Sequence, residues 1–265
     1  MRVTAVPRFG HDAAMNEMQF HSLSAGQRIA YRFIPGAGPT LVFLPGYMSD
    51  MAGSKAQAVA GWATAQGRAC LLLDYSGCGA SDGLFAEGTL NRWRDQVLAL
   101  IEAICPGPVL LVGSSMGGWL MLLVALAMPE RVAALVGIAA APDFTDWGFT
   151  AEQQMQLAAG KVLFEANSYG PEPTPTYPMF WRDGQTQRLL GGEIALACPV
   201  RLLHGQQDPD VPWDTSLRLA RALRSADVQV ALVKDGDHRL SRTSDIELLL
   251  HTLAALGSVR SRSCL

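Results

Sequence analysis

Three short polar stretches of this chain could together carry out acyl transfer, and the first of them centres on a serine. Residues 113–117 read Gly-Ser-Ser-Met-Gly, so Ser115 occupies the middle of a G-x-S-x-G pentapeptide. A serine hydroxyl is a weak nucleophile at neutral pH and requires a general base beside it. The pattern predicts Ser115 as a nucleophile, with Ser114 as a small neighbour, if the fold exposes the hydroxyl and supplies the base.

Histidine is the side chain that most often serves as such a base, and the chain has five. His204 lies within an apolar run and His251 within the last predicted helix, so we interpret both as structural. His11 and His21 precede the predicted sheet. His238 stands in a turn after the last predicted strand, at the edge where parallel sheets place functional groups. We therefore predict His238 as the base.

A carboxylate is needed to fix the tautomer of the imidazole and to stabilise the imidazolium. The loop after a further predicted strand carries Asp208 and Asp210, separated by a proline. We favour Asp208, which lies where the loop leaves the strand, and Asp210 stays open as an alternative. Asp143 and Asp237 are further possibilities, although a helix cap and a turn carboxylate would explain them equally well.

Two backbone N–H groups must stabilise the oxyanion that forms during acyl transfer. Met116 supplies one of them because it follows the nucleophile directly. The loop at residues 45–50 follows an early predicted strand and supplies the other, which we assign to Tyr47. Gly46 permits the tight turn that this loop needs. The sequence therefore predicts an oxyanion hole made of Tyr47 and Met116.

The elements around these residues alternate as a parallel sheet requires. An apolar run at 108–112 is typical of a buried strand, and 118–128 is a strong helix former, so Ser115 falls in a sharp strand-to-helix turn. After an antiparallel hairpin over 19–33, we expect strands at 40–44, 69–75, 132–138, 200–204 and 228–233, and helices at 54–66, 91–104, 213–223 and 246–256. This order predicts a parallel α/β sheet with helices on both faces.

Residues 143–196 interrupt that alternation and are predicted to form a lid insertion. The segment holds one predicted helix at 151–159 and a proline-rich stretch at 171–175. We expect residues 15–142 and 197–257 to form one core domain, with tails at 1–14 and 258–265. Four aromatic residues could line an acyl pocket, although core packing would explain them too: Trp119, Tyr177, Phe180 and Trp181.

Composition narrows the classes of function. The chain has 265 residues, 49% hydrophobic and with a formal charge of -3, which fits one compact domain and excludes a basic nucleic-acid-binding protein. Five cysteines without a C-x-x-C pair predict reduced thiols rather than disulfides or a metal site. The glycine-rich stretch at 74–83 lacks a complete nucleotide fingerprint and predicts a structural loop, with Cys78 as a buried thiol. We expect no cofactor, no metal and no stable membrane insertion.

The chain resembles the α/β-hydrolase superfamily over nearly its full length. Its most similar subgroup is that of the mitochondrial palmitoyl-protein thioesterases, also described as acyl-glucuronide esterases, with their bacterial relatives. The resemblance rests on blocks that surround the predicted site: Gly46-Tyr47 with Ser49-Asp50, Asp74-Tyr75-Ser76-Gly77, Gly113-Ser114-Ser115 with Gly117-Gly118-Trp119, Arg201-Leu202-Leu203-His204-Gly205 with Asp208, and Asp237-His238-Arg239.

The resemblance implies an α/β-hydrolase fold, with a mostly parallel eight-stranded sheet and a short lid. It also implies Ser115 as nucleophile, His238 as base and Asp208 rather than Asp210 as acid. The implied enzyme is a serine hydrolase of carboxylic esters or thioesters, acting on a small-molecule acyl substrate or an acylated protein. The segment 151–187 departs from the subgroup, which leaves the acyl specificity open.

Other functions stay open on the sequence alone. A C–C bond hydrolase or a perhydrolase would keep the same triad, and a non-catalytic binding module could keep the fold. An epoxide hydrolase or a dehalogenase would need a carboxylate where Ser115 stands. The first residues contain no apolar core of a secretory signal and no convincing transit peptide, which favours a cytoplasmic bacterial enzyme over a mitochondrial one.

Overall fold

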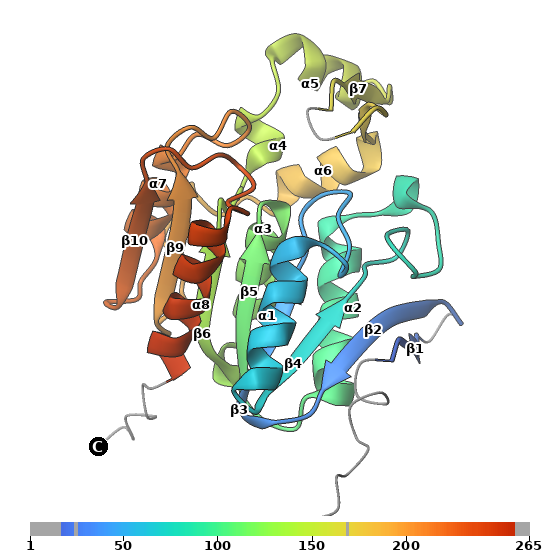
Figure 1. Ribbon diagram of the computed structural model, residues 1–265. Coiled ribbons are helices and arrows are strands. Elements are labelled where there is room, and N and C mark those ends of the chain that lie inside the picture. The colour runs from blue at the N-terminus through green and yellow to red at the C-terminus, as the bar shows by residue number, and fades with distance from the viewer. Residues whose placement is uncertain (1–16, 24–25, 168–169, 258–265) are drawn as a thin grey trace, which may run out of the picture.

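The computed structural model describes residues 17–23, 26–167 and 170–257. The tails predicted at 1–14 and 258–265 lie outside the described residues. Within the described residues, eight strands form one sheet in the order β1-β2-β4-β3-β5-β6-β9-β10 (Figure 1). The strands are β1 (Gln19–Ser22), β2 (Arg28–Ile34), β3 (Ala37–Leu44), β4 (Arg68–Leu73), β5 (Val109–Ser114), β6 (Val132–Ile138), β9 (Val200–Gly205) and β10 (Val228–Val233).

Most of this sheet is parallel, as the alternation of elements predicts. β1 pairs antiparallel with β2, and β2 pairs antiparallel with β4, so the expected hairpin forms one edge. The pairs β3·β4, β3·β5, β5·β6, β6·β9 and β9·β10 are parallel. The carboxyl ends of these parallel strands share one edge, which therefore collects the loops that carry the predicted site residues.

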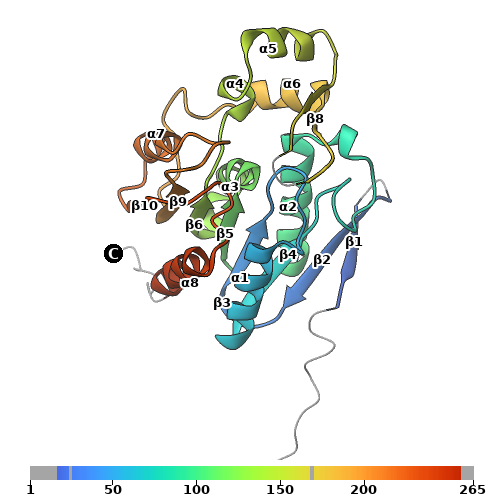
Figure 2. The same ribbon diagram turned by 45° about the horizontal axis from the view of Figure 1, so that its top comes forward.

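Helices cover both faces of the sheet. α1 (Ser54–Ala65) and α8 (Thr243–Gly257) lie on one face, and α2 (Leu90–Ile104), α3 (Met116–Ala127) and α7 (Asp214–Ala222) lie on the other (Figure 2). Alternate strand residues point to opposite faces, so the core divides into two clusters. One cluster holds Val97, Leu120 and Leu219, and the other holds Val59 and Leu253. The α/β-hydrolase fold predicted from the sequence is confirmed.

Local signals explain where several helices begin and end. The side chain of Thr89 caps α2 by accepting a hydrogen bond from the backbone N–H of Arg92. Thr150 forms a capping box with Gln153 at the start of α5 (Ala151–Ala158). Gly67 follows α1 with a φ of 62°, a left-handed conformation that glycine adopts without strain. These elements match their predicted positions to within a few residues.

The segment at residues 143–196, called the lid segment below, lies over the carboxyl edge of the sheet in Figure 1. It contains α4 (Phe144–Trp147), α5, the two-stranded pair β7 (Leu163–Glu165) and β8 (Thr174–Thr176), and α6 (Pro178–Thr186). The sequence predicts only α5. Helix propensity does not predict α6, because the segment contains Gly184 and glycine is a poor helix former. Tertiary packing nevertheless requires a glycine at this position, since a Cβ there would lie 2.5 Å from the Thr145 side chain.

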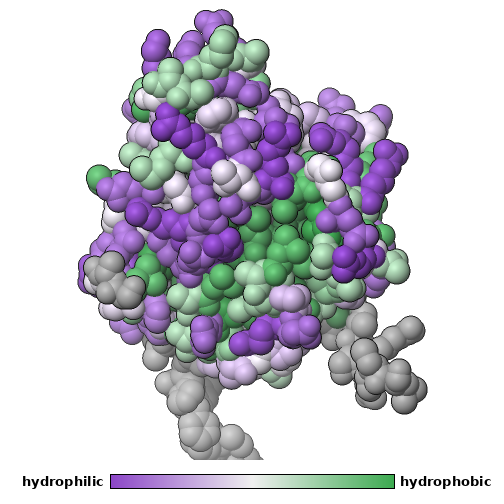
Figure 3. All heavy atoms as spheres, turned by 180° about the vertical axis from the view of Figure 1, so that it is seen from behind, coloured by the Kyte–Doolittle hydropathy of each residue, from purple (hydrophilic) through white to green (hydrophobic). Residues whose placement is uncertain are grey.

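The surface outside the lid segment is mixed in character. Seen from behind, on the face away from α1 and α8, apolar residues gather in the middle and polar residues surround them (Figure 3). Among the helices of the described residues, none is both long and apolar enough to cross a membrane.

Candidate active site

Ser115 stands in the sharp turn between β5 and α3. Its backbone has φ 55° and ψ -122°, a conformation that side-chain-bearing residues seldom adopt. The turn works only because small residues surround it. A Cβ on Gly117 would lie 2.1 Å from the carbonyl oxygen of Leu44, and one on Gly113 would lie 2.3 Å from that of Gly117. The two glycines therefore let strand, turn and helix approach closely.

His238 lies against this serine. Its Nε2 is 3.1 Å from Ser115 Oγ, and its Nδ1 is 2.8 Å from Asp208 Oδ2. A carboxylate only accepts hydrogen bonds, so the ring carries its proton on Nδ1 and leaves Nε2 to accept from the serine hydroxyl. This tautomer is the one that a general base needs. The structure thus brings together the three residues predicted as nucleophile, base and acid.

Asp208 has a fully buried side chain that is nevertheless well supplied with donors. Its Oδ1 accepts hydrogen bonds from the backbone N–H groups of Asp210 and Val211, at 2.9 and 2.8 Å. Burial opposes ionisation, but the hydrogen bonds from His204 and His238 outweigh it and hold the pKa of Asp208 well below its usual range. The carboxylate is therefore charged beside His238 at neutral pH.

The alternative carboxylates have other partners. Asp210 is exposed, and it contributes only its backbone N–H to Asp208. Asp237 accepts a hydrogen bond from the backbone N–H of Leu240, as a turn carboxylate does. Asp143 accepts from the backbone N–H groups of Leu189 and Leu190, at 2.7 and 2.8 Å. Asp143 thus joins the start of the lid segment to its far end, and its side chain makes no helix cap.

His204 is a residue whose connection to the site the sequence reasoning missed. It is fully buried in β9, as expected of a structural histidine, but its Nε2 lies 3.2 Å from Asp208 Oδ2 and 3.1 Å from the carbonyl oxygen of Val211. Both neighbours accept, so Nε2 carries the proton, and Nδ1 accepts from the hydroxyl of Ser216 at 2.7 Å. Asp208 therefore lies between two imidazoles. The signal available in the sequence was the four-residue spacing from His204 to Asp208 across a strand end.

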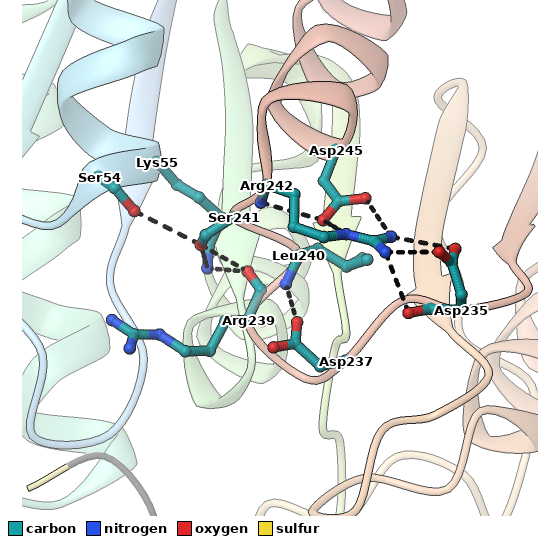
Figure 4. Close-up of polar contacts among 9 residues, drawn as sticks. All are labelled: Ser54, Lys55, Asp235, Asp237, Arg239, Leu240, Ser241, Arg242 and Asp245. Atoms are coloured by element: carbon teal, nitrogen blue, oxygen red, sulfur yellow. Dashed lines mark hydrogen bonds and ion pairs between the residues drawn. The ribbon is translucent and has the colours of Figure 1, made fainter.

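Polar contacts hold the loop of His238 at both sides (Figure 4). The guanidinium of Arg242 bridges Asp235 at the start of the loop and Asp245 in the first turn of α8. On the other side, the ammonium of Lys55 in α1 donates to the backbone carbonyl of Arg239. These contacts join the loop of His238 to two helices that cover one face of the sheet.

The loop that carries Gly46 and Tyr47 lies beside Ser115. A Cβ on Gly46 would be 3.3 Å from the Cβ of Ser115. Asp74, after β4, accepts a hydrogen bond from the backbone N–H of Met51 at 2.7 Å and one from that of Ala80 at 2.9 Å. The glycine-rich stretch predicted as structural is therefore a brace for this loop. The hydroxyl of Tyr47 donates to the carbonyl oxygen of Pro175 in β8, at 2.9 Å.

Cys78 lies in the same glycine-rich stretch and behaves as a structural thiol. It is buried, and burial raises its pKa to about 12, so it carries no thiolate at neutral pH. Cys70, Cys105 and Cys198 are also free thiols, and Cys264 lies outside the described residues.

A cavity of about 620 Å³ opens over Ser115 and His238. Its apolar walls include Phe144, Trp147 and Phe149 of the lid segment. The four aromatic residues for which a pocket role and core packing were both open are not among the residues that line this cavity: Trp119, Tyr177, Phe180 and Trp181.

Those four aromatics have packing roles instead. The indole N–H of Trp119 donates to the carbonyl oxygen of Gln187, and that of Trp181 donates to the carbonyl oxygen of Thr145. Phe180 is buried in the core, and the ring of Tyr177 contacts that of Phe85. Phe180 of α6 packs on Trp93 of α2 in the core, whereas Trp181 packs against a separate apolar cluster of the lid segment around Phe149 and Leu157.

Comparisons with known proteins agree with the fold. Residues 39–162 match the family described as alpha/beta hydrolase fold. The human protein named palmitoyl-protein thioesterase ABHD10, mitochondrial, is 41% identical over 229 residues, which are 85% of this chain and 75% of that protein. The mouse protein of the same name is 41% identical over 240 residues, 89% of this chain and 81% of its own length.

Solved structures give the same result. The mouse alpha/beta hydrolase domain-containing protein 10 superposes with a TM-score of 0.85 at 40% identity, covering 91% of this chain and 98% of its own. A protein from Agrobacterium vitis S4 superposes with a TM-score of 0.85 at 36% identity, covering 91% of this chain and all of that one (100%). Relatives this similar, matched over most of both chains, establish that this chain belongs to the α/β-hydrolase family.

Proposed function

We propose that this chain is a serine hydrolase that cleaves carboxylic esters or thioesters through an acyl-enzyme, with Ser115, His238 and Asp208 as its catalytic triad. The observation that carries the proposal is the pair of hydrogen bonds that joins Asp208 to His238 and His238 to Ser115, at 2.8 and 3.1 Å, in the wall of a cavity. A buried charged carboxylate, a correctly protonated imidazole and a serine hydroxyl that lines a cavity are the parts that this chemistry needs.

The first half of the reaction forms the acyl-enzyme. Ser115 Oγ attacks the acyl carbon while His238 Nε2 takes the hydroxyl proton, and Asp208 stabilises the imidazolium through Nδ1–H. The tetrahedral oxyanion accepts hydrogen bonds from the backbone N–H groups of Tyr47 and Met116. When this intermediate collapses, the bond to the leaving oxygen or sulfur breaks, and His238 returns its proton to that atom.

The second half regenerates the enzyme. Water attacks the acyl-enzyme carbon and gives a proton to His238 Nε2, and a second oxyanion forms in the same place. Its collapse breaks the bond to Ser115 Oγ, which takes the proton back, and the carboxylic acid leaves. The open cavity over Ser115 supports this step because water can reach the acyl carbon there.

The substrate class follows from the cavity and the relatives together. The apolar side chains of Phe144, Trp147 and Phe149 offer a surface for an acyl chain. The relatives at 41% identity are named palmitoyl-protein thioesterases. We therefore place acyl thioesters, including S-acylated proteins, and acyl esters such as acyl glucuronides among its substrates.

Covalent labelling combined with kinetics tests the proposal. A fluorophosphonate probe should label the wild-type chain and Ser114→Ala, and it should not label Ser115→Ala. Ser115→Ala should also lose hydrolysis of short and long p-nitrophenyl esters. A labelled or fully active Ser115→Ala variant would contradict the assignment. Profiling acyl-CoA, S-palmitoyl peptide and acyl glucuronide then ranks the substrates, and a strong preference for acyl chains of two to four carbons would count against a depalmitoylase.

The names of the relatives also bear on localisation. They are described as mitochondrial, which favours the mitochondrial alternative over the cytoplasmic one expected from the sequence. Fractionation of cells that express the full chain with a C-terminal tag distinguishes the two.

A further inference from the structure

Lys55 is a cation in the wall of the same cavity as Ser115 and His238. It lies in the first turn of α1, where the helix dipole disfavours positive charge. Its ammonium donates to the carbonyl oxygen of Arg239 and lies 3.5 Å from the hydroxyl oxygen of Ser241 (Figure 4). Among the ion pairs of the described residues, none includes Lys55.

This environment is unfavourable for a positive charge. Burial lowers the pKa of Lys55 to about 8, and the guanidinium of Arg239 acts in the same direction, although the carboxylates of Asp237 and Asp245 oppose the shift. No ion pair of the described residues joins Lys55 to Asp237 or Asp245, so an anion bound beside the ammonium would supply a direct counter-charge. A negatively charged ligand would therefore explain the placement of a lysine at this position.

Arg239 adds a second cation to this corner. It directly follows His238, it is exposed, and it lines the cavity. Figure 4 shows its side chain pointing away from the ion pairs of Arg242. Three carboxylates, Asp50, Glu165 and Asp210, also line the cavity. Lys55 and Arg239 are the lysine and the arginine among the lining residues of the cavity.

The position of the corner indicates which part of a substrate would meet it. His238 must deliver its proton to the leaving oxygen or sulfur, so the leaving group lies on the His238 side of the acyl carbon. Lys55 contacts the backbone of the next residue, Arg239, which places both cations on that side. The acyl chain would instead contact the apolar residues of the lid segment that line the cavity.

We propose that Lys55 and Arg239 form a subsite for an anionic group, a carboxylate or a phosphate, carried by the alcohol or thiol that the reaction releases. The subsite rests on the proposed hydrolase function and adds a preference to it. It distinguishes substrates by their leaving group, whereas the lid segment distinguishes them by their acyl chain.

Matched substrates test this proposal. Butyryl esters of 4-hydroxybenzoate and of methyl 4-hydroxybenzoate differ in one carboxylate, and butyryl thioesters of 4′-phosphopantetheine and pantetheine differ in one phosphate. The wild-type enzyme should have a higher kcat/KM for the anionic member of at least one pair, and that pair identifies the anion. Lys55→Gln and Arg239→Gln should each lower the anionic-to-neutral ratio by roughly tenfold, the effect of one charged hydrogen bond.

The ratio separates binding from a structural role. Glutamine keeps a donor for the Arg239 carbonyl, and any general damage to the His238 loop lowers kcat/KM for both members of a pair and cancels. Lys161→Gln removes the same charge from an exposed position outside the cavity, and it should leave the ratio at its wild-type value.

Two results would overturn the subsite. One is a wild-type ratio at or below unity for both pairs, and the other is an unchanged ratio in Lys55→Gln and Arg239→Gln. Either result, with neutral esters still hydrolysed in a Ser115-dependent manner, rejects the subsite and leaves the hydrolase intact. Absence of both hydrolysis and fluorophosphonate labelling rejects the hydrolase itself.

Discussion

The strained backbone conformation of Ser115 should lower the free energy of unfolding of the protein. Its φ of 55° and ψ of -122° belong to a region that glycine occupies freely and other residues occupy at a cost of about 1–3 kcal/mol. Ser115→Gly removes that strain, and Ser115→Ala keeps it. Both variants lose the hydroxyl and its hydrogen bond to His238, so this loss cancels when the two are compared.

The expected difference follows from two opposing contributions. Glycine relieves the strain, but it also raises the conformational entropy of the unfolded chain, which costs about 0.4–1 kcal/mol. The net expectation is that Ser115→Gly is more stable than Ser115→Ala by about 1 kcal/mol, with a Tm higher by about 2–4 °C for a chain of this size. Both variants should be inactive.

Urea unfolding and calorimetry measure this difference, with a second alanine-glycine pair as reference. Ala58 lies within α1, where glycine has no strain to relieve, so Ala58→Gly should lower the free energy of unfolding by about 1 kcal/mol. The sign should therefore reverse between the two positions. If Ser115→Gly proves less stable than Ser115→Ala by the amount seen at Ala58, the strain argument is refuted.

Four further expectations concern other parts of the site. Gly117→Ala brings a Cβ to within 2.1 Å of the Leu44 carbonyl oxygen and should lower stability by about 1–3 kcal/mol in thermal melts, whereas Gly61→Ala, which meets open space, should be neutral or stabilising. His204→Phe should lower kcat/KM for a neutral ester roughly tenfold with little change in KM, because phenylalanine has no donor and Asp208 loses a charged hydrogen bond; wild-type kinetics would disprove a positioning role. Asp143→Ala leaves two backbone N–H groups without their acceptor and should make residues 143–196 more sensitive to limited proteolysis than Asp146→Ala, which removes only a surface ion pair. The preference for anionic leaving groups should fall as pH rises through about 8, where Lys55 loses its proton, and this pH dependence should vanish in Lys55→Gln; an identical profile in that variant would contradict the assignment of the titration.

The core of the fold was predictable because its signals are local and repeated. Apolar runs such as 108–112, followed by strong helix formers, fix the alternation of strand and helix, and a parallel sheet then brings the loops at its carboxyl edge together. Ser115, Asp208 and His238 are far apart in the chain, but each follows a strand of that sheet. The proximity of the three residues in the structure follows from the topology.

The secondary structure of the lid segment was poorly predicted because its helices and the orientation of their side chains depend on tertiary contacts. α6 begins at Pro178, contains a glycine that packs on Thr145, and orients its aromatic residues by contact with the core. A propensity argument cannot supply that orientation, so the sequence left both a pocket role and a packing role open for Phe180 and Trp181. The contact between His204 and Asp208 was not predicted for a related reason. An apolar strand pattern shows that a residue is buried but does not reveal what its polar atoms contact.

Tyr47 connects the loop at residues 45–50 with the lid segment, two parts of the molecule whose sequences could otherwise change independently. In the proposed mechanism its backbone N–H stabilises the oxyanion, while its hydroxyl donates to the carbonyl of Pro175 in the lid segment. Any ligand that displaces β8 therefore pulls on the loop that stabilises the transition state. Exchange of the lid segment between homologues would therefore change the turnover rate together with the range of accepted acyl chains. A chimaera built for a new specificity should keep both Tyr47 and its hydrogen-bond acceptor in β8.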